Sequence, residues 1–238
     1  YASNEACEFA DKMQNFINEI GHNESENLAK IRGPFPLWEK SIYKNGAPIR
    51  NCTVTTIAPT GELSILGGCS AGIEPNYGLT RIHRYEDRVL HIFSPSLERF
   101  LELAKERGFY SQVLEEEVKN RGEIGNMIGI PDDVKKIFMT AHEILPEWHV
   151  KMQAAFQKHV DNGVSKTVNL KNSATEEDIK ETYLLAYKTE CLGVTVFRDG
   201  CKGQVFSVGI GEKPIVKTTK GFIRSRPEVL GLGPHVDR

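Results

Sequence analysis

The strongest constraint on the fold comes from residues 163–200, where a strand-like run, a helical run and a second strand-like run follow one another. The outer runs, GVSKTVNL and GVTVFRDG, are rich in the β-branched residues typical of strands. Thr175 and Asp178 have the spacing of a capping box at the start of the helix, and Gly193 is expected to end it. A crossover of this length predicts parallel strands joined in the right-handed sense. The sequence therefore indicates the α/β class.

Capping residues predict further helices. Ser94 and Pro95 begin one that closes at Gly108, Ser111 begins a second, and Pro146 begins a third. The third is expected to be half buried, because it aligns His149, Met152, Phe156 and Val160 on one face.

The first 20 residues predict an amphipathic helix with an apolar face that needs a partner. The apolar side chains recur mostly at spacings of three and four: Cys7, Phe9, Met13, Phe16, Ile17 and Ile20. A second helix is expected over residues 24–32. A strand is expected over residues 53–57, which are mostly β-branched.

A glycine-rich loop, TTIAPTGELSILGGCSAGIEP, follows that strand at residues 55–75. Backbone N–H groups at a helix start, with the hydroxyls of Thr60 and Ser64, favour a bound phosphate. A tight turn between a core strand and a core helix explains the same residues equally well. The loop has neither the spacing nor the lysine of a P-loop, and it lacks the dinucleotide-binding fingerprint. Glu62 would repel a phosphate unless its carboxylate points away or meets a cation.

Composition limits the classes of partner. The chain has 238 residues, 39% of them hydrophobic and 26% charged, as expected for one large domain or two small ones. A net charge of −2 gives no general attraction to a nucleic acid polymer or an anionic membrane. No membrane span or signal peptide is recognisable, so a cytoplasmic setting is expected. Five cysteines without a C-x-x-C pair predict reduced thiols and no metal site.

Three other motifs favour structural readings. His142 and His149 are seven residues apart across Pro146, whereas a helical zinc motif needs a spacing of four. Ser165 and Lys166 lie at a turn-to-strand junction with no base to activate a nucleophile. RIHRYEDR, residues 81–88, is interpreted as a solvated hairpin or loop with paired charges.

Three long motifs resemble the adenosylcobalamin-dependent (class II) ribonucleotide reductases. RNCTVTTIAPTGELSILGGCSAGIEP resembles that family's substrate-phosphate loop. PEWHVKMQAAFQKHVDNGVSKTVNL and ATEEDIKETYLLAYKTECLGVTVFRDG resemble its barrel helix, the strand that follows and its final βαβ unit. The resemblance covers about residues 1–205 and implies the C-terminal part of a ten-stranded α/β barrel with flanking helices.

The resemblance also implies which residues hold the substrate. The positions that match the family's phosphate-binding loop are Pro59, Thr60, Gly61, Glu62, Leu63 and Ser64. Glu62 stands where the family usually has threonine, so the hydroxyl of that position is missing while the backbone donors remain. The following segment, with Cys69 and Gly72 to Pro75, is expected to pack beside the site.

The family's radical cysteine lies in an N-x-C-x-E motif, which this sequence does not contain. No catalytic residue is therefore assigned, and the chain is expected to be inactive alone. We expect a fragment, split subunit or intein-separated segment that needs the N-terminal part of a reductase, with a homodimer possible for the full enzyme. The implied ligands are a ribonucleoside di- or triphosphate and adenosylcobalamin, whose contacts are not assigned. Residues 206–238 are interpreted as a tail or linker toward a further C-terminal domain.

A second hypothesis comes from a different functional class. The chain would be a stand-alone nucleotide-binding or scaffolding module that has lost the chemistry. Binding of nucleotide but not cobalamin by the chain alone would favour this hypothesis. Reduction that appears on mixing with a polypeptide carrying the N-x-C-x-E motif would favour the reductase.

Overall fold

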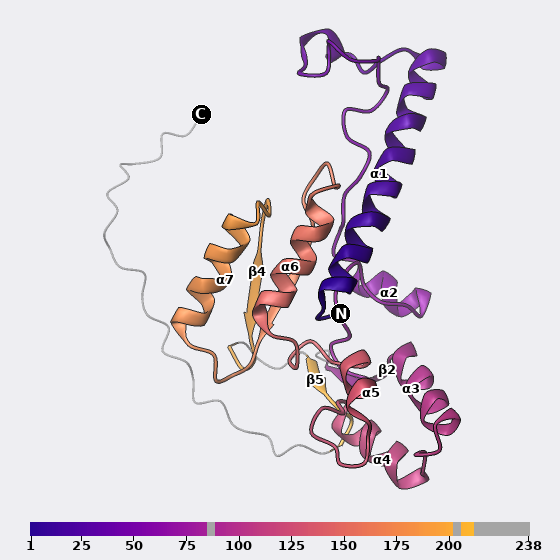
Figure 1. The fold of residues 1–238 in the computed structure, drawn as a ribbon, viewed down its shortest axis with the longest axis vertical. Helices are drawn as coiled ribbons and strands as arrows, with labels where there is room; N and C mark the ends of the chain where they lie inside the picture. Colours follow the sequence, from indigo (N-terminus) through magenta and orange to yellow (C-terminus); the bar gives the residue numbers. More distant parts are fainter. Residues whose placement is uncertain (85–88, 202–205, 212–238) are drawn as a thin grey trace.

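The computed structural model describes residues 1–84, 89–201 and 206–211. Figure 1 shows two neighbouring groups of elements. The first group contains α1 (Asn4–Arg32), α6 (Pro146–Gln157), β3 (Thr167–Leu170), α7 (Glu176–Lys188) and β4 (Thr195–Arg198). The second contains β1 (Thr80–Arg84), β2 (Val89–Phe93), α3 (Pro95–Glu106), α4 (Gln112–Arg121), α5 (Asp132–Ile137) and β5 (Phe206–Val208). The short helix α2 (Gly61–Gly67) lies beside α1 in this view.

The predicted βαβ unit is confirmed. Strands β3 and β4 pair in parallel from Thr167 opposite Thr195 to Leu170 opposite Arg198. The capping box of α7 is present, with the Thr175 side chain accepting from the backbone of Asp178 and the Asp178 side chain accepting from the backbone of Thr175. The helix ends earlier than Gly193, because Lys188 is its last residue and Glu190 takes the left-handed turn at φ 60°. The protein is α/β, and its described residues do not by themselves close a ten-stranded barrel.

Helix α6 is more deeply buried than the half-buried helix predicted, because it has neighbours on both sides. One face meets α1 through Met152, Ala155 and Phe156, and the other meets β3 and α7 through Val150. Eight of its side chains are buried: His149, Val150, Met152, Gln153, Ala154, Ala155, Phe156 and Gln157. This helix therefore holds the first group of elements together.

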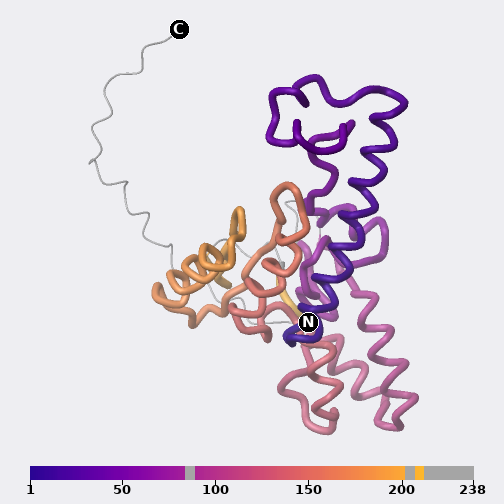
Figure 2. The backbone as a smooth tube through the Cα atoms, turned by 45° about the horizontal axis from the view of Figure 1, so that its top comes forward, coloured from indigo at the N-terminus to yellow at the C-terminus, as the bar shows by residue number. Residues whose placement is uncertain are grey.

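The two helices predicted near the N-terminus form one continuous helix, α1, of 29 residues. Gly21 does not interrupt it, and a Cβ at that position would lie 3.1 Å from Val54 Cγ2, so the glycine admits a neighbouring chain. That chain returns from the far end of α1 (Figure 2), where residues 33–50 fold around the 3-10 helix η1 (Trp38–Lys40). Asn51 N–H donates to Ser25 Oγ over 2.8 Å and fixes the returning segment against the helix.

Only part of the predicted apolar face of α1 is covered. Cys7 packs with Ala10 against α6. The remaining members are exposed: Phe9 at 68%, Met13 at 38%, Phe16 at 63%, Ile17 at 46% and Ile20 at 55%. The face therefore keeps the need for a partner that the sequence indicates.

The predicted strand at residues 53–57 is reduced to one parallel bridge between Ile57 and Val164. The reason lies in Asp161, whose Oδ2 accepts from the N–H groups of Val54 and Thr55 at 2.7 and 3.2 Å. A carboxylate therefore takes the place of a neighbouring strand for these two donors.

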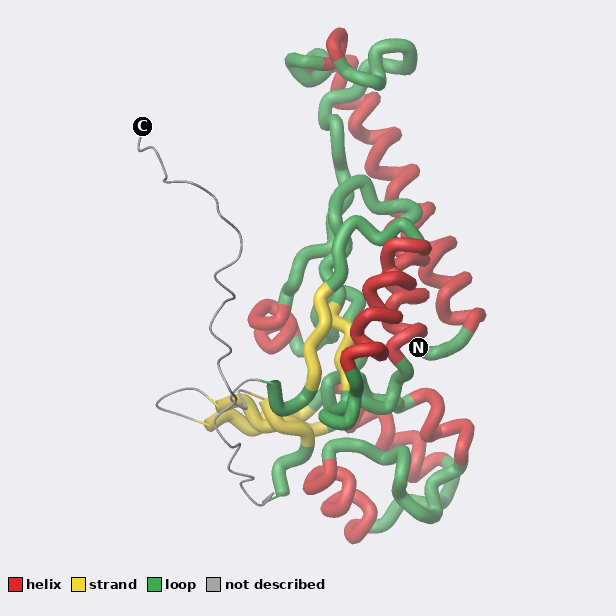
Figure 3. Tube along the Cα trace, turned by 90° about the vertical axis from the view of Figure 1, so that its left-hand side faces the viewer, coloured by secondary structure: helices red, strands yellow, loops and turns green. Residues whose placement is uncertain are grey.

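The second group of elements is built on an antiparallel sheet in the order β2-β1-β5 (Figure 3). Strands β1 and β2 pair antiparallel, which supports the hairpin that the sequence offers as one of two alternatives. Ile82 and His83 are buried, so this strand is not solvated as predicted, and residues 85–88 of the motif lie outside the described residues. The core beneath comes from helices α3 to α5 and their loops: Leu79, Leu97, Phe100, Val118, Ile124, Met127, Ile130, Val134 and Phe138. Strand β5 lies in the predicted tail, so residues 206–208 are part of a sheet, and the rest of the tail beyond residue 211 lies outside the described residues.

Two glycines let β5 approach α4 closely. A Cβ on Gly122 would lie 2.3 Å from the backbone nitrogen of Gly209, and a Cβ on Gly209 would lie 2.2 Å from the carbonyl oxygen of Asn120. Both residues have left-handed φ angles, 73° and 79°. The approach therefore excludes any side chain at either position.

Gly122→Ala is expected to lower the free energy of unfolding by about 3 kcal/mol, the sum of left-handed strain and overpacking. Gly108→Ala is the matched control, because Gly108 has φ 74° and nothing within 4 Å of its Cβ position. The control should cost about 1 kcal/mol from backbone strain alone. Urea unfolding followed by circular dichroism measures both. Equal losses would show that β5 does not lie against α4.

Within the described residues, no helix combines the length and the apolar character needed to cross a membrane.

Candidate functional site

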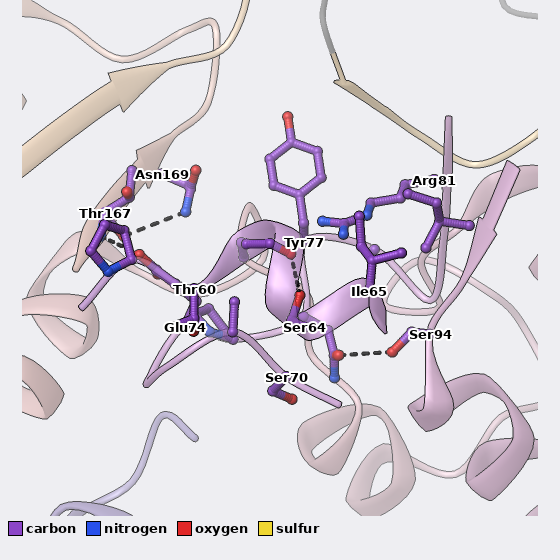
Figure 4. Close-up of a pocket in the computed structure, with 18 of the residues that line it drawn as sticks. Thr60, Ser64, Ile65, Ser70, Glu74, Tyr77, Arg81, Ser94, Thr167 and Asn169 are labelled. Atoms are coloured by element: carbon purple, nitrogen blue, oxygen red, sulfur yellow. Dashed lines mark hydrogen bonds between the residues drawn. The ribbon is translucent and has the colours of Figure 1, made fainter. Parts of the chain in front are cut away.

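A cavity of about 890 Å³ lies between the two groups of elements. One wall is the segment from Ala58 to Gly78, a second is the β1–β2 hairpin with the start of α3, and the third comes from β3 and β4. Figure 4 shows that Thr60, Ser64, Tyr77, Arg81 and Thr167 gather around this space from three separate parts of the chain. A cavity of this size suits a ligand as large as a nucleotide.

Four of the six residues predicted to bind phosphate line the cavity: Pro59, Thr60, Gly61 and Ser64. The other two, Glu62 and Leu63, are exposed and are not part of its lining. These positions lie within one turn of α2, and successive residues of a helix point in different directions. Some of them therefore face the cavity and others face solvent. The carboxylate that replaces the usual threonine therefore lies outside the cavity.

The hydroxyl groups of Thr60 and Ser64 differ in their hydrogen bonds. Thr60 is the N-cap of α2, yet its side chain makes no capping hydrogen bond. Ser64 is buried, and its Oγ donates to the carbonyl oxygen of Gly61 over 2.6 Å. Gly72, with φ 51°, brings the next segment close, since a Cβ there would lie 3.3 Å from the carbonyl oxygen of Ala58. The loop from Ala58 to Pro75 is therefore compactly closed beside the cavity.

The end of the first wall and the hairpin supply an aromatic and a charged group. Tyr77 lines the cavity and meets the ring of His142 edge-on, with 5.0 Å between centroids. Burial, with the nearby Asp199 carboxylate, raises the pKa of Tyr77 to about 12, so its hydroxyl stays protonated at neutral pH. Arg81, from β1, also lines the cavity and brings a positive charge to it.

A buried ion pair joins two walls of the cavity. Lys166 Nζ donates to Glu74 Oε2 over 2.5 Å, and the lysine side chain is 0% exposed while the glutamate is 28% exposed. Lys166 Nζ also contacts His149 Nδ1 at 2.9 Å. Glu74 and Thr167 belong to the lining and Lys166 does not, so the pair reaches the cavity through Glu74.

The histidines of the rejected zinc motif lie in different places. His142 packs on Tyr77, whereas His149 contacts Lys166. Among the described residues, no group of three or more His, Cys, Asp or Glu side chains is arranged to hold a metal ion.

Comparison with known proteins gives the family. A family model described as "Ribonucleotide reductase, barrel domain" matches residues 46–197, more than half of the chain. The chain belongs to the ribonucleotide reductase family. This match confirms the resemblance found in the sequence motifs, and it includes every residue of the candidate phosphate loop.

Within the family, the chain is similar to curated reductases that depend on vitamin B12. The chain is 44% identical over 233 residues to the vitamin B12-dependent ribonucleoside-diphosphate reductase of Thermoplasma acidophilum, a match that covers 96% of the chain and 30% of the relative. It is 40% identical over 217 residues to a protein of the same name from Mycobacterium tuberculosis, covering 91% of the chain and 31% of that relative. The chain thus spans about 30% of the length of these reductases.

A solved structure supports the fold. The Actinobacillus ureae class Id ribonucleotide reductase alpha subunit aligns with a TM-score of 0.68 over 84% of this chain and 35% of that chain, at 24% sequence identity. At this identity the likeness is evidence for the fold alone.

The sequence does not predict the hydrogen-bonded cluster of Lys166, His149 and Glu74 beside the cavity. The sequence indicates Lys166 as a junction residue and Glu74 as packing beside the site, whereas the structure joins them across 92 positions of sequence. The available signal was a lysine immediately before a strand predicted to lie in the core, because a buried lysine needs a partner.

Proposed function

We propose that this chain is part of a vitamin B12-dependent ribonucleotide reductase and supplies the wall that holds the substrate phosphates. The observation that carries the proposal is the shared cavity lining of Pro59, Thr60, Gly61 and Ser64. The family match and the relatives' name support the reaction, reduction of a ribonucleotide to a 2′-deoxyribonucleotide. The same name favours a ribonucleoside diphosphate as substrate.

In this proposal the phosphates lie against α2 and the nucleoside extends toward the hairpin and the strands. Thr60 donates a hydroxyl hydrogen bond, and Ser64 donates one when its hydroxyl turns from the Gly61 carbonyl oxygen to the phosphate. The N–H groups of the first turn of α2 add backbone donors. Glu62 does not oppose the bound phosphate, because it is not part of the cavity lining. Arg81 adds an attractive charge from β1.

The relatives' name implies adenosylcobalamin as the source of radical chemistry for the longer enzyme. The residues described here do not identify a corrin site. The polar side chains of the cavity are mainly hydroxyls and amides whose scale and chemistry suit a phosphorylated sugar. We therefore assign the cofactor to the complete reductase and derive no step through it.

A longer assembly is also part of the proposal. The exposed apolar residues of α1 form a contiguous helical face, and such a face is normally covered by another part of a protein. We assign residues 1–205, with strand β5, to the C-terminal part of the catalytic barrel, and the rest of the tail to a linker toward a further domain. The exposed face of α1 is assigned to contact with the N-terminal part of a reductase. The complete enzyme would then be able to form a homodimer.

The double variant Thr60→Ala, Ser64→Ala is expected to weaken binding of a ribonucleoside diphosphate by about 1 to 3 kcal/mol. The loss follows from removing two hydroxyl donors to a charged phosphate. Isothermal titration of the purified 238-residue chain measures the affinity.

Thr56→Ala is the matched control, because Thr56 precedes the cavity loop, is exposed, and donates its hydroxyl to the carbonyl oxygen of Gly163. Its affinity should equal that of the unaltered chain. Equal affinity in the double variant would show that the phosphates lie elsewhere. A folded chain that binds no diphosphate would remove the assignment of the cavity.

A further inference from the structure

The Lys166 ammonium group is fully enclosed and all three of its hydrogens have acceptors. They go to Glu74 Oε2, to His149 Nδ1 and to the carbonyl oxygen of Thr167. An ammonium group has three donors and no acceptor, so this set is complete. Burial is the main cause that lowers the pKa of Lys166, and the Glu74 carboxylate opposes that shift.

His149 is held in one tautomer by its two neighbours. Nε2 lies 3.0 Å from the carbonyl oxygen of Ala141, which accepts only, so Nε2 carries the hydrogen and donates it. Nδ1 is then free to accept from Lys166. Burial, reinforced by the charge of Lys166, lowers the pKa of His149 to about 3 and keeps the ring neutral. Helix α6 thus fixes the direction of the lysine.

Glu74 uses both carboxylate oxygens to bind groups at the start of β3. Oε2 accepts from Lys166, and Oε1 accepts from the Thr167 N–H over 2.5 Å. Glu74, Ser70 and Thr167 all face the cavity (Figure 4). The carboxylate therefore joins the segment that follows α2 to the strand on the other side of the cavity.

We propose that Glu74, Lys166 and His149 form a positioning unit that holds residues 70–75 against β3 in the arrangement a nucleotide needs. The inference rests on the proposed function, because it assumes that the cavity receives a ribonucleoside diphosphate. Glu74 fixes the wall, Lys166 fixes Glu74, and His149 fixes Lys166. Binding of the diphosphate depends on this series of contacts, because the loop that carries Thr60 and Ser64 continues directly into residues 70–75.

Glu74→Gln tests the unit with little change of shape. The glutamine has one acceptor oxygen in place of two, so either Lys166 or the Thr167 N–H loses its partner. Glu143→Gln is the matched control, because both Glu143 oxygens also accept from backbone N–H groups, those of Gly125 and Thr140, at 2.8 and 2.7 Å. Glu143 does not line the cavity.

The first measurement uses the 238-residue chain without nucleotide. Hydrogen exchange of the Thr167 amide should accelerate in Glu74→Gln and remain unchanged in Glu143→Gln. The ¹⁵N resonances of His149 should show the Nε2–H tautomer in the unaltered chain and should shift in Glu74→Gln. Unchanged exchange and unchanged histidine resonances in Glu74→Gln would overturn the positioning unit.

The second measurement titrates a ribonucleoside diphosphate into the same three proteins. Affinity should fall about tenfold in Glu74→Gln, the loss of roughly one hydrogen bond's free energy, and should stay unchanged in Glu143→Gln. Addition of diphosphate to the unaltered chain should also shift the His149 resonances, which a merely structural cluster would not show. Binding that is equally tight in all three proteins would overturn the inference and leave the proposed function standing. If the unaltered chain binds no diphosphate, the proposed function fails, and the exchange data alone decide whether the wall is anchored as described.

Discussion

Asp161→Ala is expected to lower the free energy of unfolding by about 3 kcal/mol, because several donors lose one acceptor at once. The carboxylate accepts from Val54 and Thr55 N–H, and also from Asn18 Nδ2 at 3.2 Å and His22 Nε2 at 2.9 Å. It therefore joins α1, the segment before the cavity loop and the turn after α6. Two backbone N–H groups would remain partly buried without a partner. Urea unfolding of the variant measures the loss.

The pH dependence of stability provides a second readout of Asp161. Burial alone would raise the pKa of this carboxyl, but hydrogen bonds from Val54, His22, Asn18 and Thr55 together lower it below the ordinary value. The stabilisation is therefore present above the pKa of the unfolded chain and is lost as the pH falls through the pKa of the folded chain. Asp161→Ala should lack this component of the acid unfolding.

Asp11→Ala is the control for a charge on the surface. Asp11 pairs with Lys158 at 3.0 Å and His159 at 3.4 Å. Its loss should cost less than about 1 kcal/mol, because exposed pairs contribute little. Equal losses for Asp11→Ala and Asp161→Ala would contradict the role of Asp161 as a junction.

The parts of the fold that were predicted from sequence depend on short-range signals. The capping box at Thr175 and Asp178 lies within one helical turn, and the crossover that follows fixes the parallel pairing of β3 and β4. Proline and serine at the start of α3 act over the same distance. Such features are readable because every partner lies within a few residues.

The errors occur where distant residues override local preference. Residues 53–57 have strand propensity, but Asp161 takes the donors that a neighbouring strand would use. Gly21 lies within α1 because Val54 occupies the space beside it. Strand β5 was not predicted, because its segment of the sequence has weak periodicity. Its position in the fold depends on close contact between Gly122 and Gly209.

The candidate site divides in the same way. The loop from Pro59 to Ser64 was recognisable from a continuous motif, and the structure places four of its six residues on one cavity. The ion pair of Glu74 and Lys166 was not recognisable, because neither residue signals the other across the intervening sequence. The sequence also does not show which residues of α2 face the cavity. Only the folded helix shows that Glu62 is not part of the lining.

Mixing this chain with the N-terminal part of a vitamin B12-dependent reductase is expected to produce ribonucleotide reduction that neither polypeptide gives alone. The added polypeptide supplies the N-x-C-x-E motif, whose cysteine is absent from residues 1–238. In the proposed function, this chain supplies the wall that binds the phosphates. Chromatography of the deoxyribonucleotide product, with adenosylcobalamin and a dithiol present, measures the gain from no detectable product.

Variants of α1 separate assembly from substrate binding. Phe16→Asp and Ile20→Asp place charges on the face that is 63% and 55% exposed at these residues, so the isolated chain should fold and bind diphosphate as before. Complementation should be lost, because a buried interface excludes an unpaired carboxylate. Thr60→Ala with Ser64→Ala should have the opposite effect and weaken substrate binding while the two polypeptides still associate. A chain that binds diphosphate but gives no reduction with any N-terminal partner would favour a stand-alone nucleotide-binding module, because the cavity would then function without the rest of a reductase.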